Sequence, residues 1–173
     1  FKESKAGQSK GVYPKTQLGN NLKTIASLIL SDSSTKVYYI SLGSFDTHVN
    51  QQERQNALFR QMNDAVYAFA KDLQANNKFD DVLLFTFSEF GRRVAQNASN
   101  GTDHGTANNM FLISGALKQK GLINAMPDLT KLDNGDLISQ VDFKQVYATV
   151  LNKWLAADDA SILGHHYDHL NFI

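Results

Sequence analysis

Two short segments, residues 36–42 and 81–87, are apolar, aromatic or β-branched at nearly every position, and they constrain this chain most. A strand with such a continuous pattern is typically buried on both faces, as the strands of parallel sheets are. Residues 110–114 predict a third short strand. Apolar residues recur with a helical period over residues 20–30 and 51–76, before and between the first two strands. This alternation predicts a three-layer α/β/α domain with a mostly parallel sheet.

The remaining segments complete a single-domain prediction. Residues 1–19 are polar and rich in glycine, which indicates a leading segment or linker, and residues 20–173 form one α/β domain. Asn134-Gly135 predicts a hairpin within the turn-rich residues 121–138. Asp142 and Gln145 have the spacing of a capping box, and they precede an apolar stripe that ends at Trp154 and Leu155.

The overall composition excludes several classes of function. Lys and Arg number 17 and Asp and Glu also number 17, so no net positive field attracts nucleic acid. The chain contains no cysteine, which excludes disulfides and thiolate metal ligands. No apolar run reaches the roughly 18 residues that a membrane-spanning helix requires. The oligomeric state cannot be read from these features.

Residues with metal-binding and anion-binding chemistry follow the predicted strands. Asp46 and His48 follow the first strand, Glu89 and Arg92 follow the second, and the pair Asp103-His104 precedes the third. Ligands in open α/β sheets bind at the carboxyl ends of strands. Carboxylates and imidazoles bind Zn, Mn or Fe, and an oxygen-rich set also binds Mg or Ca. We therefore expect a divalent metal at Asp46, His48, Glu89, Asp103 and His104, with Arg92 near an anion.

Each of these motifs also has a simpler interpretation. Asp46 and His48, or Asp103 and His104, could belong to solvated turns, and Glu89 could pair with a neighbouring arginine. Three further histidines lie at residues 165, 166 and 169. In a helix His165 and His169 would share one face as a metal pair, but we favour a polar segment that is rich in histidine.

Three short motifs together resemble a bacterial family. Residues 45–48 (Phe-Asp-Thr-His), 88–92 (Ser-Glu-Phe-Gly-Arg) and 101–105 (Gly-Thr-Asp-His-Gly) occur in this order. Over residues 35–173 the sequence is similar to the family known as domain of unknown function 1501. That family is usually placed in the alkaline phosphatase and sulfatase superfamily, whose members are three-layer α/β proteins with divalent metals at strand ends.

The resemblance implies a metal-dependent hydrolase of small phosphate or sulfate esters. It also implies that the chain is the C-terminal part of a larger protein, with the attacking Ser or Thr upstream of Phe1. Many family members are exported, which implies a periplasmic or extracellular location. The alternative is a non-catalytic exported binding protein that retains the fold. Metal content and hydrolysis assays discriminate these two functions.

Overall fold

A computed structural model describes residues 7–173, which fall into two compact units. The first, here called the helical unit, comprises the chain up to Val82 together with residues Asn97–Thr102. The second, here called the C-terminal unit, comprises Leu83–Gln96 and Asp103–Ile173. Among the helices of the described residues, none combines the length and the hydrophobicity of a membrane-spanning segment.

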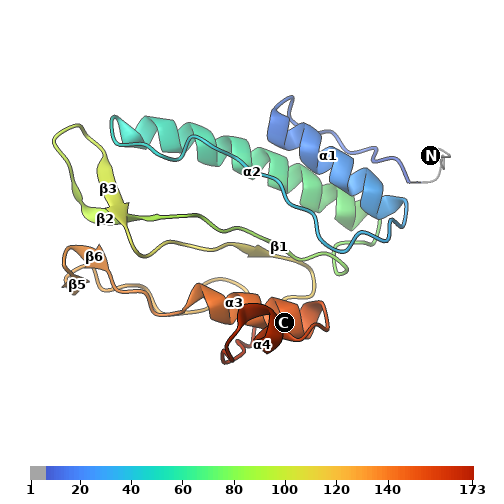
Figure 1. Cartoon of the computed structure of the whole chain (residues 1–173). Coiled ribbons are helices and arrows are strands. Elements are labelled where there is room, and N and C mark those ends of the chain that lie inside the picture. The colour runs from blue at the N-terminus through green and yellow to red at the C-terminus, as the bar shows by residue number, and fades with distance from the viewer. Residues whose placement is uncertain (1–6) are drawn as a thin grey trace. The chain divides into compact units, whose positions relative to one another are not determined.

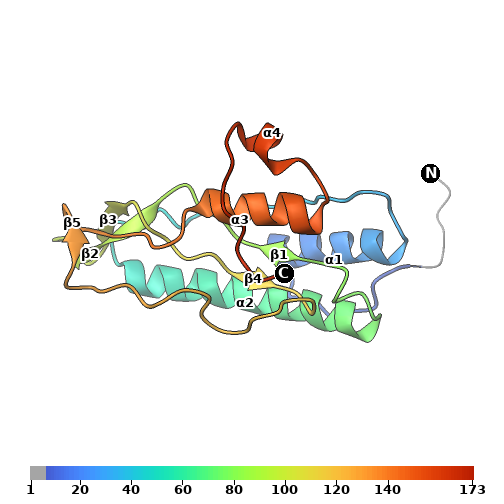
Figure 2. The same cartoon turned by 90° about the horizontal axis from the view of Figure 1, so that it is seen from below.

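Two helices that lie side by side form the frame of the helical unit. Helix α1 (Gln17–Leu30) and helix α2 (Gln51–Ala75) lie together in both views (Figures 1 and 2). The helical periods of the sequence predicted both. Their buried side chains recur at the three- and four-residue spacings of one helix face: Leu18, Leu22 and Ala26 on α1, and Ala65, Phe69 and Leu73 on α2.

The segment before α1 is fastened to α2 by a buried carboxylate. Asp72 on α2 is only 5% exposed. Its Oδ2 accepts hydrogen bonds from the Ser9 hydroxyl and, at 2.9 Å, from the Tyr13 hydroxyl. The side-chain amide of Asn76 donates to its other oxygen at 3.3 Å. These neutral donors satisfy the lone pairs of a carboxylate that would otherwise be costly to bury.

The connection between α1 and α2 is extended. Lys78 beyond the end of α2 pairs with Asp32 beyond the end of α1 at 3.2 Å, so both helices end near each other. The connection after α1 must therefore run back along the length of α2 to reach Gln51, where α2 begins. This distance is about 37 Å, for 25 residues at about 1.5 Å each. Residues 36–42 lie in this connection and are not a strand. Val37 and Tyr39 are 67% and 71% exposed.

The strands of the C-terminal unit are short and pair in twos. β1 (Leu84–Phe85) pairs antiparallel with β4 (Leu112–Ile113), and β5 (Leu132–Asp133) pairs antiparallel with β6 (Asp136–Leu137). β2 (Gly91–Gln96) pairs with β3 (Thr102–Gly105). The β5–β6 hairpin turns at Asn134-Gly135, both with positive φ as a tight hairpin turn requires, and this confirms the predicted hairpin.

The predicted three-layer α/β/α fold with a mostly parallel, alkaline-phosphatase-like sheet is therefore wrong. The predicted second and third strands pair antiparallel, and the predicted first strand is an exposed extended segment. Continuous apolar character was interpreted as burial on both faces. Instead, residues 37–42 alternate between exposed and half-buried side chains, and Phe87 after β1 is 51% exposed. The connection from β1 to β4 contains the β2–β3 hairpin and no helix, whereas parallel strands are usually joined by a helical crossover.

A helical segment carries the core of the C-terminal unit. Helix α3 (Phe143–Thr149) begins at the predicted capping box: the Asp142 carboxylate accepts from the Lys144 N–H at 2.9 Å, and Gln145 reaches back to the Asp142 N–H at 3.2 Å. It continues as a π-helical turn, η1 (Val150–Trp154), and a short helix α4 (Asp159–Leu163) follows. The buried core residues are Val146, Val150, Phe172 and Ile173.

Candidate metal-binding site

Asp46 and His48 are the two predicted ligands in the helical unit, and their side chains lie next to each other. His48 Nε2 lies 2.9 Å from Asp46 Oδ1, and the two side chains are 43% and 60% exposed. Two ligand atoms that each lie about 2.1 Å from one ion, at an angle of about 90°, are about 3.0 Å apart. The observed separation therefore fits two donors of one divalent cation. It equally fits a carboxylate–imidazole hydrogen bond, so a cation would compete with a proton for the pair.

Local backbone geometry brings these two side chains together. The Thr47 N–H donates to the Phe45 carbonyl at 2.9 Å, which closes a three-residue turn around Asp46. Thr47 is 1% exposed, and its hydroxyl accepts from Gln55 of α2 at 3.1 Å. With Thr47 turned into the protein, its two neighbours are both open to solvent, as alternate residues of an extended chain are.

Residues 97–102 hold the backbone beside His48. The Asn97 side-chain amide donates to the His48 carbonyl at 3.1 Å. A Cβ on Gly101 would lie 2.2 Å from that same carbonyl oxygen, so only glycine permits this approach. In the sequence Gly101 stands out only as a glycine in a long polar loop. Its contact with the backbone of His48 could not be deduced from the order of residues in the chain.

The same loop completes the start of α2. Asn50 precedes α2 in a left-handed conformation and makes no side-chain capping bond. Its N–H and that of Gln51 instead donate to the carbonyls of Ser99 and Asn100, at 3.1 and 3.0 Å. These bonds satisfy donors that every helix leaves open at its N-terminus. Residues 97–100 thus hold the backbone of both His48 and the first residues of α2.

Two of the predicted residues of the C-terminal unit, His104 and Arg92, lie against Phe90. The His104 ring stacks on Phe90, with centroids 3.8 Å apart and an interplanar angle of 9°, and the Arg92 guanidinium lies 5.0 Å from the Phe90 centroid. The carbonyl of Phe90 accepts from Asn108 at 2.8 Å and from Ser88 at 2.9 Å, which holds the backbone at this residue. Phe90 thus links His104 and Arg92, a role that the sequence did not indicate.

Two other predicted ligands of this unit are exposed. Glu89 lies between β1 and β2, and Asp103 lies on β3. Arg93, next to Arg92, does not face an anion site, because its Nε lies 3.5 Å from Asp136 of β6. This contact holds β2 against the β5–β6 hairpin.

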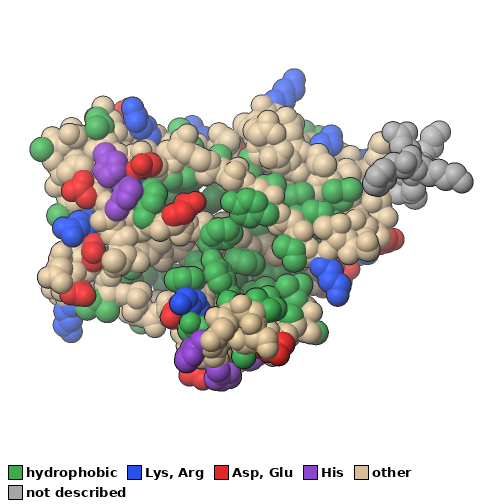
Figure 3. Space-filling view, viewed as in Figure 1, with side chains coloured by type: hydrophobic (Ala, Val, Ile, Leu, Met, Phe, Trp, Pro, Cys, Tyr) green, Lys and Arg blue, Asp and Glu red, His purple; other side chains and the backbone are tan. Residues whose placement is uncertain are grey.

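The three remaining histidines gather near α4. Figure 3 shows histidine side chains next to acidic ones over this helix. Residues 165–173 are not helical, so His165 and His169 do not share a helix face. His165 contacts Tyr167 with ring centroids 5.0 Å apart, and His166 lies 6.3 Å from His169.

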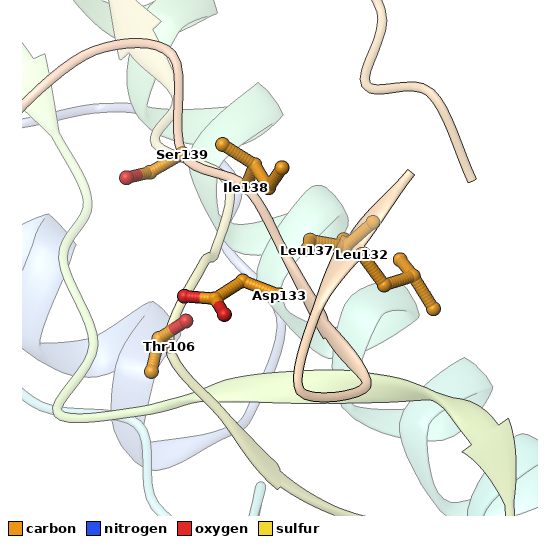
Figure 4. Close-up of a pocket in the computed structure, with 6 residues that line it drawn as sticks. All are labelled: Thr106, Leu132, Asp133, Leu137, Ile138 and Ser139. Atoms are coloured by element: carbon orange, nitrogen blue, oxygen red, sulfur yellow. The ribbon is translucent and has the colours of Figure 1, made fainter. Parts of the chain in front are cut away.

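A shallow hollow of about 440 Å³ lies between residue 106 and the β5–β6 hairpin (Figure 4). The Asp133 carboxylate and the Thr106 hydroxyl point toward each other across it, and side chains of Leu132, Leu137 and Ile138 lie on its apolar side. It contains none of the predicted ligands. Its polar groups are oxygens only, and most of its lining residues are exposed.

The comparison with protein families extends the resemblance of the motifs to almost the whole chain. The model of the family described as "protein of unknown function (DUF1501)" matches residues 3–169. The chain belongs to this family. Searches of curated proteins and of solved structures gave no match to this DUF1501 protein. The family description names no activity.

Proposed function

We propose that this DUF1501 protein binds a divalent cation through Asp46 and His48. The proposal is carried by one observation, the 2.9 Å separation between a carboxylate oxygen and an imidazole nitrogen that are both open to solvent. An oxygen and a nitrogen donor suit Zn, Mn or Fe. Because thiolates are absent from the chain, the site favours these ions over softer ones.

The protein around the pair supports binding by limiting its motion. Thr47 is anchored to α2, and the backbone of His48 is held by Asn97. Ligands fixed by surrounding contacts lose less conformational entropy when an ion binds. Two donors alone give weak to moderate affinity. Glu89, Asp103 and His104 stay predicted additional ligands.

The bound cation would serve to hold a small anionic ester of phosphate or sulfate, as the family resemblance implies. A divalent cation at this site would polarise an ester oxygen. The local residues favour binding over hydrolysis. Thr47, the hydroxyl side chain between the two donors, is buried, and its oxygen contacts Gln55 and the Phe45 carbonyl, so it is not placed to attack. We therefore place ester binding first and metal-dependent hydrolysis second.

Calorimetric titration with Zn²⁺ and Mn²⁺ tests the proposal. His48→Ala and Asp46→Asn should each weaken binding by roughly tenfold or more, because loss of even an outer partner of a metal ligand costs about that much. His165→Ala removes an exposed histidine from the other unit and should leave the affinity unchanged. Equal affinities for the wild type and both donor variants would contradict the proposal.

Incubation of the metal-loaded protein with aryl phosphates and aryl sulfates distinguishes binding from hydrolysis. We expect the ester to bind without turnover. Metal-dependent release of the phenol, lost in His48→Ala, would instead establish the hydrolase. Elemental analysis of the purified protein gives an independent measure of which cation it carries.

A further inference from the structure

Residues 164–173, here called the strap, return from α4 onto α3 and η1. Gly164 ends α4 with a positive φ of 69°, a conformation that reverses the chain and favours glycine. Beyond it, Phe172 is 0% exposed and Ile173 9% exposed, both in the core of the C-terminal unit. The strap is therefore an irregular segment whose last residues supply part of a hydrophobic core.

Side chains of η1 and the end of α3 hold the strap's backbone. The Leu170 N–H donates to the Thr149 hydroxyl at 2.8 Å, and the Lys153 ammonium donates to the Leu170 carbonyl at 2.7 Å. The Lys118 N–H donates to the Phe172 carbonyl at 3.0 Å. Each contact is a single bond from a separate residue, unlike the continuous ladder of a strand, so the strap can leave without unwinding a helix.

One side-chain pair joins the strap to α4. His169 Nε2 lies 3.0 Å from Asp159 Oδ2, with side chains 24% and 7% exposed. The other oxygen of Asp159 accepts from the Asn152 amide of η1 at 3.0 Å. Among the described residues of the C-terminal unit, Asp159 is the only buried carboxylate, and His169 is its only ring partner. Loss of this partner would leave a buried charge with fewer hydrogen-bond donors, the Asn152 amide and a backbone N–H.

We infer that the Asp159–His169 pair is an acid-sensitive latch that holds the strap on α3 and η1. Its three parts are a glycine pivot at Gly164, a partly buried pair next to it, and the aromatic anchor Phe172 beyond it. When the pair breaks, the strap detaches from Gly164 onward. Detachment uncovers the apolar surface of Val146 and Val150.

The charges around the pair set the direction of its pH dependence. The hydrogen bond from His169 is the main reason that the pKa of Asp159 lies below its usual value, with smaller contributions from Asn152 and from the backbone, while burial of the carboxylate opposes the shift. The His166 ring lies 6.3 Å from the His169 ring, and the Lys153 ammonium donates to the Leu170 carbonyl. A carboxyl group whose pKa is lowered by folding stabilises the folded form at pH values above the ordinary Asp pKa of about 3.9. The latch therefore holds at neutral pH and opens as the pH falls below about 4.

Hydrogen exchange of the full chain tests the latch. In His169→Gln the peptide covering the strap should exchange roughly tenfold to a hundredfold faster at neutral pH, since a hydrogen bond to a charged group is lost. The peptide covering α3 should keep its protection. His166→Gln removes the adjacent, exposed histidine and should behave as the wild type. Asp159→Asn keeps the shape of the side chain and should also accelerate hydrogen exchange in the strap.

A titration to acid pH supplies the second measurement. Trp154, the only tryptophan, packs against the core that Phe172 completes, so its fluorescence reports the strap. The wild type should show a transition below about pH 4 that Asp159→Asn lacks. Unchanged strap exchange in both variants would overturn the inference. Simultaneous loss of protection in the strap and α3 would overturn it as well, because the pair would then support the whole unit.

Discussion

The clearest quantitative prediction concerns Tyr13 and the buried carboxylate of Asp72. Tyr13→Phe removes one hydroxyl and keeps the ring, so the apolar contacts of residue 13 remain. The lost bond is 2.9 Å long and ends on a carboxylate that is 5% exposed. Water cannot fully replace the missing donor at such a buried oxygen. The variant therefore tests one charge-assisted hydrogen bond in isolation.

The expected magnitude follows from the partners that remain. A hydrogen bond to a charged group contributes about 1.5–3 kcal/mol to stability. After the substitution, Asp72 keeps the Ser9 hydroxyl and the Asn76 amide, so it is not left without a donor. We therefore expect the free energy of unfolding of the helical unit to fall by about 2 kcal/mol.

The same tyrosine predicts a loss of stability in alkaline solution. Burial, and next the hydrogen bond to Asp72, raise the pKa of Tyr13 well above its ordinary value of about 10. The unfolded chain loses this proton near pH 10, while the folded chain retains it. Stability that depends on the proton is thus present below about pH 10 and declines above it. Tyr13→Phe should lack this part of the decline.

Urea unfolding followed by far-ultraviolet circular dichroism measures both effects, since α1 and α2 dominate the helical signal of this unit. The difference between wild type and Tyr13→Phe should shrink as the pH rises from about 8 to about 11. A difference below about 0.5 kcal/mol at pH 7 would refute the reasoning, because an exposed bond contributes that little. So would a difference that grows with pH.

Three further predictions concern the C-terminal unit, each measured by urea unfolding. Gly91→Ala should lower the free energy of unfolding by about 2 kcal/mol or more, because the added Cβ would lie 1.8 Å from the Ala107 carbonyl oxygen. The control is Gly43→Ala in the helical unit, which should be nearly neutral because the space around Gly43 is open. Asp142→Ala should cost about 1 kcal/mol through loss of the α3 cap, and an unchanged midpoint would show that α3 does not depend on it. Trp154→Ala should cost about 3 kcal/mol, since this half-buried ring packs on the core, and a cost under about 1 kcal/mol would contradict that packing.

Local patterns predicted the local structure of this chain well. The helical period predicted α1 and α2, the spacing of Asp142 and Gln145 predicted the cap of α3, and Asn134-Gly135 predicted the β5–β6 hairpin. Each of these features depends on residues that are close together in the sequence. Strand pairing depends on distant residues, and for that reason the sheet prediction was wrong. The apolar residues 36–42 carry the β propensity of a strand but are not part of any sheet among the described residues.

The candidate site likewise contains local features that the sequence predicted and long-range contacts that it did not predict. Asp46 and His48 were predicted as ligands of one metal site because both follow residues 36–42, and their side-chain atoms lie 2.9 Å apart. The contacts that hold them, from Thr47 to Gln55 and from Asn97 to the backbone of His48, required the three-dimensional structure. For His104, the sequence indicated a donor to a metal but not the stacking of its ring on Phe90.

The docking of residues 97–102 beside His48 has a consequence for the order of folding. The first turn of α2 receives its acceptors from Ser99 and Asn100, about 50 residues later in the chain. Closing a loop of about 50 residues costs about 3.5 kcal/mol of chain entropy, which local contacts cannot offset in advance. During vectorial synthesis α2 can therefore form from its middle outward, while its N-terminus stays frayed until residue 100 has emerged. The Asp46–His48 pair would be among the last parts of the helical unit to become rigid, and a ribosome-stalled chain ending before residue 97 should show α2 without an ordered His48.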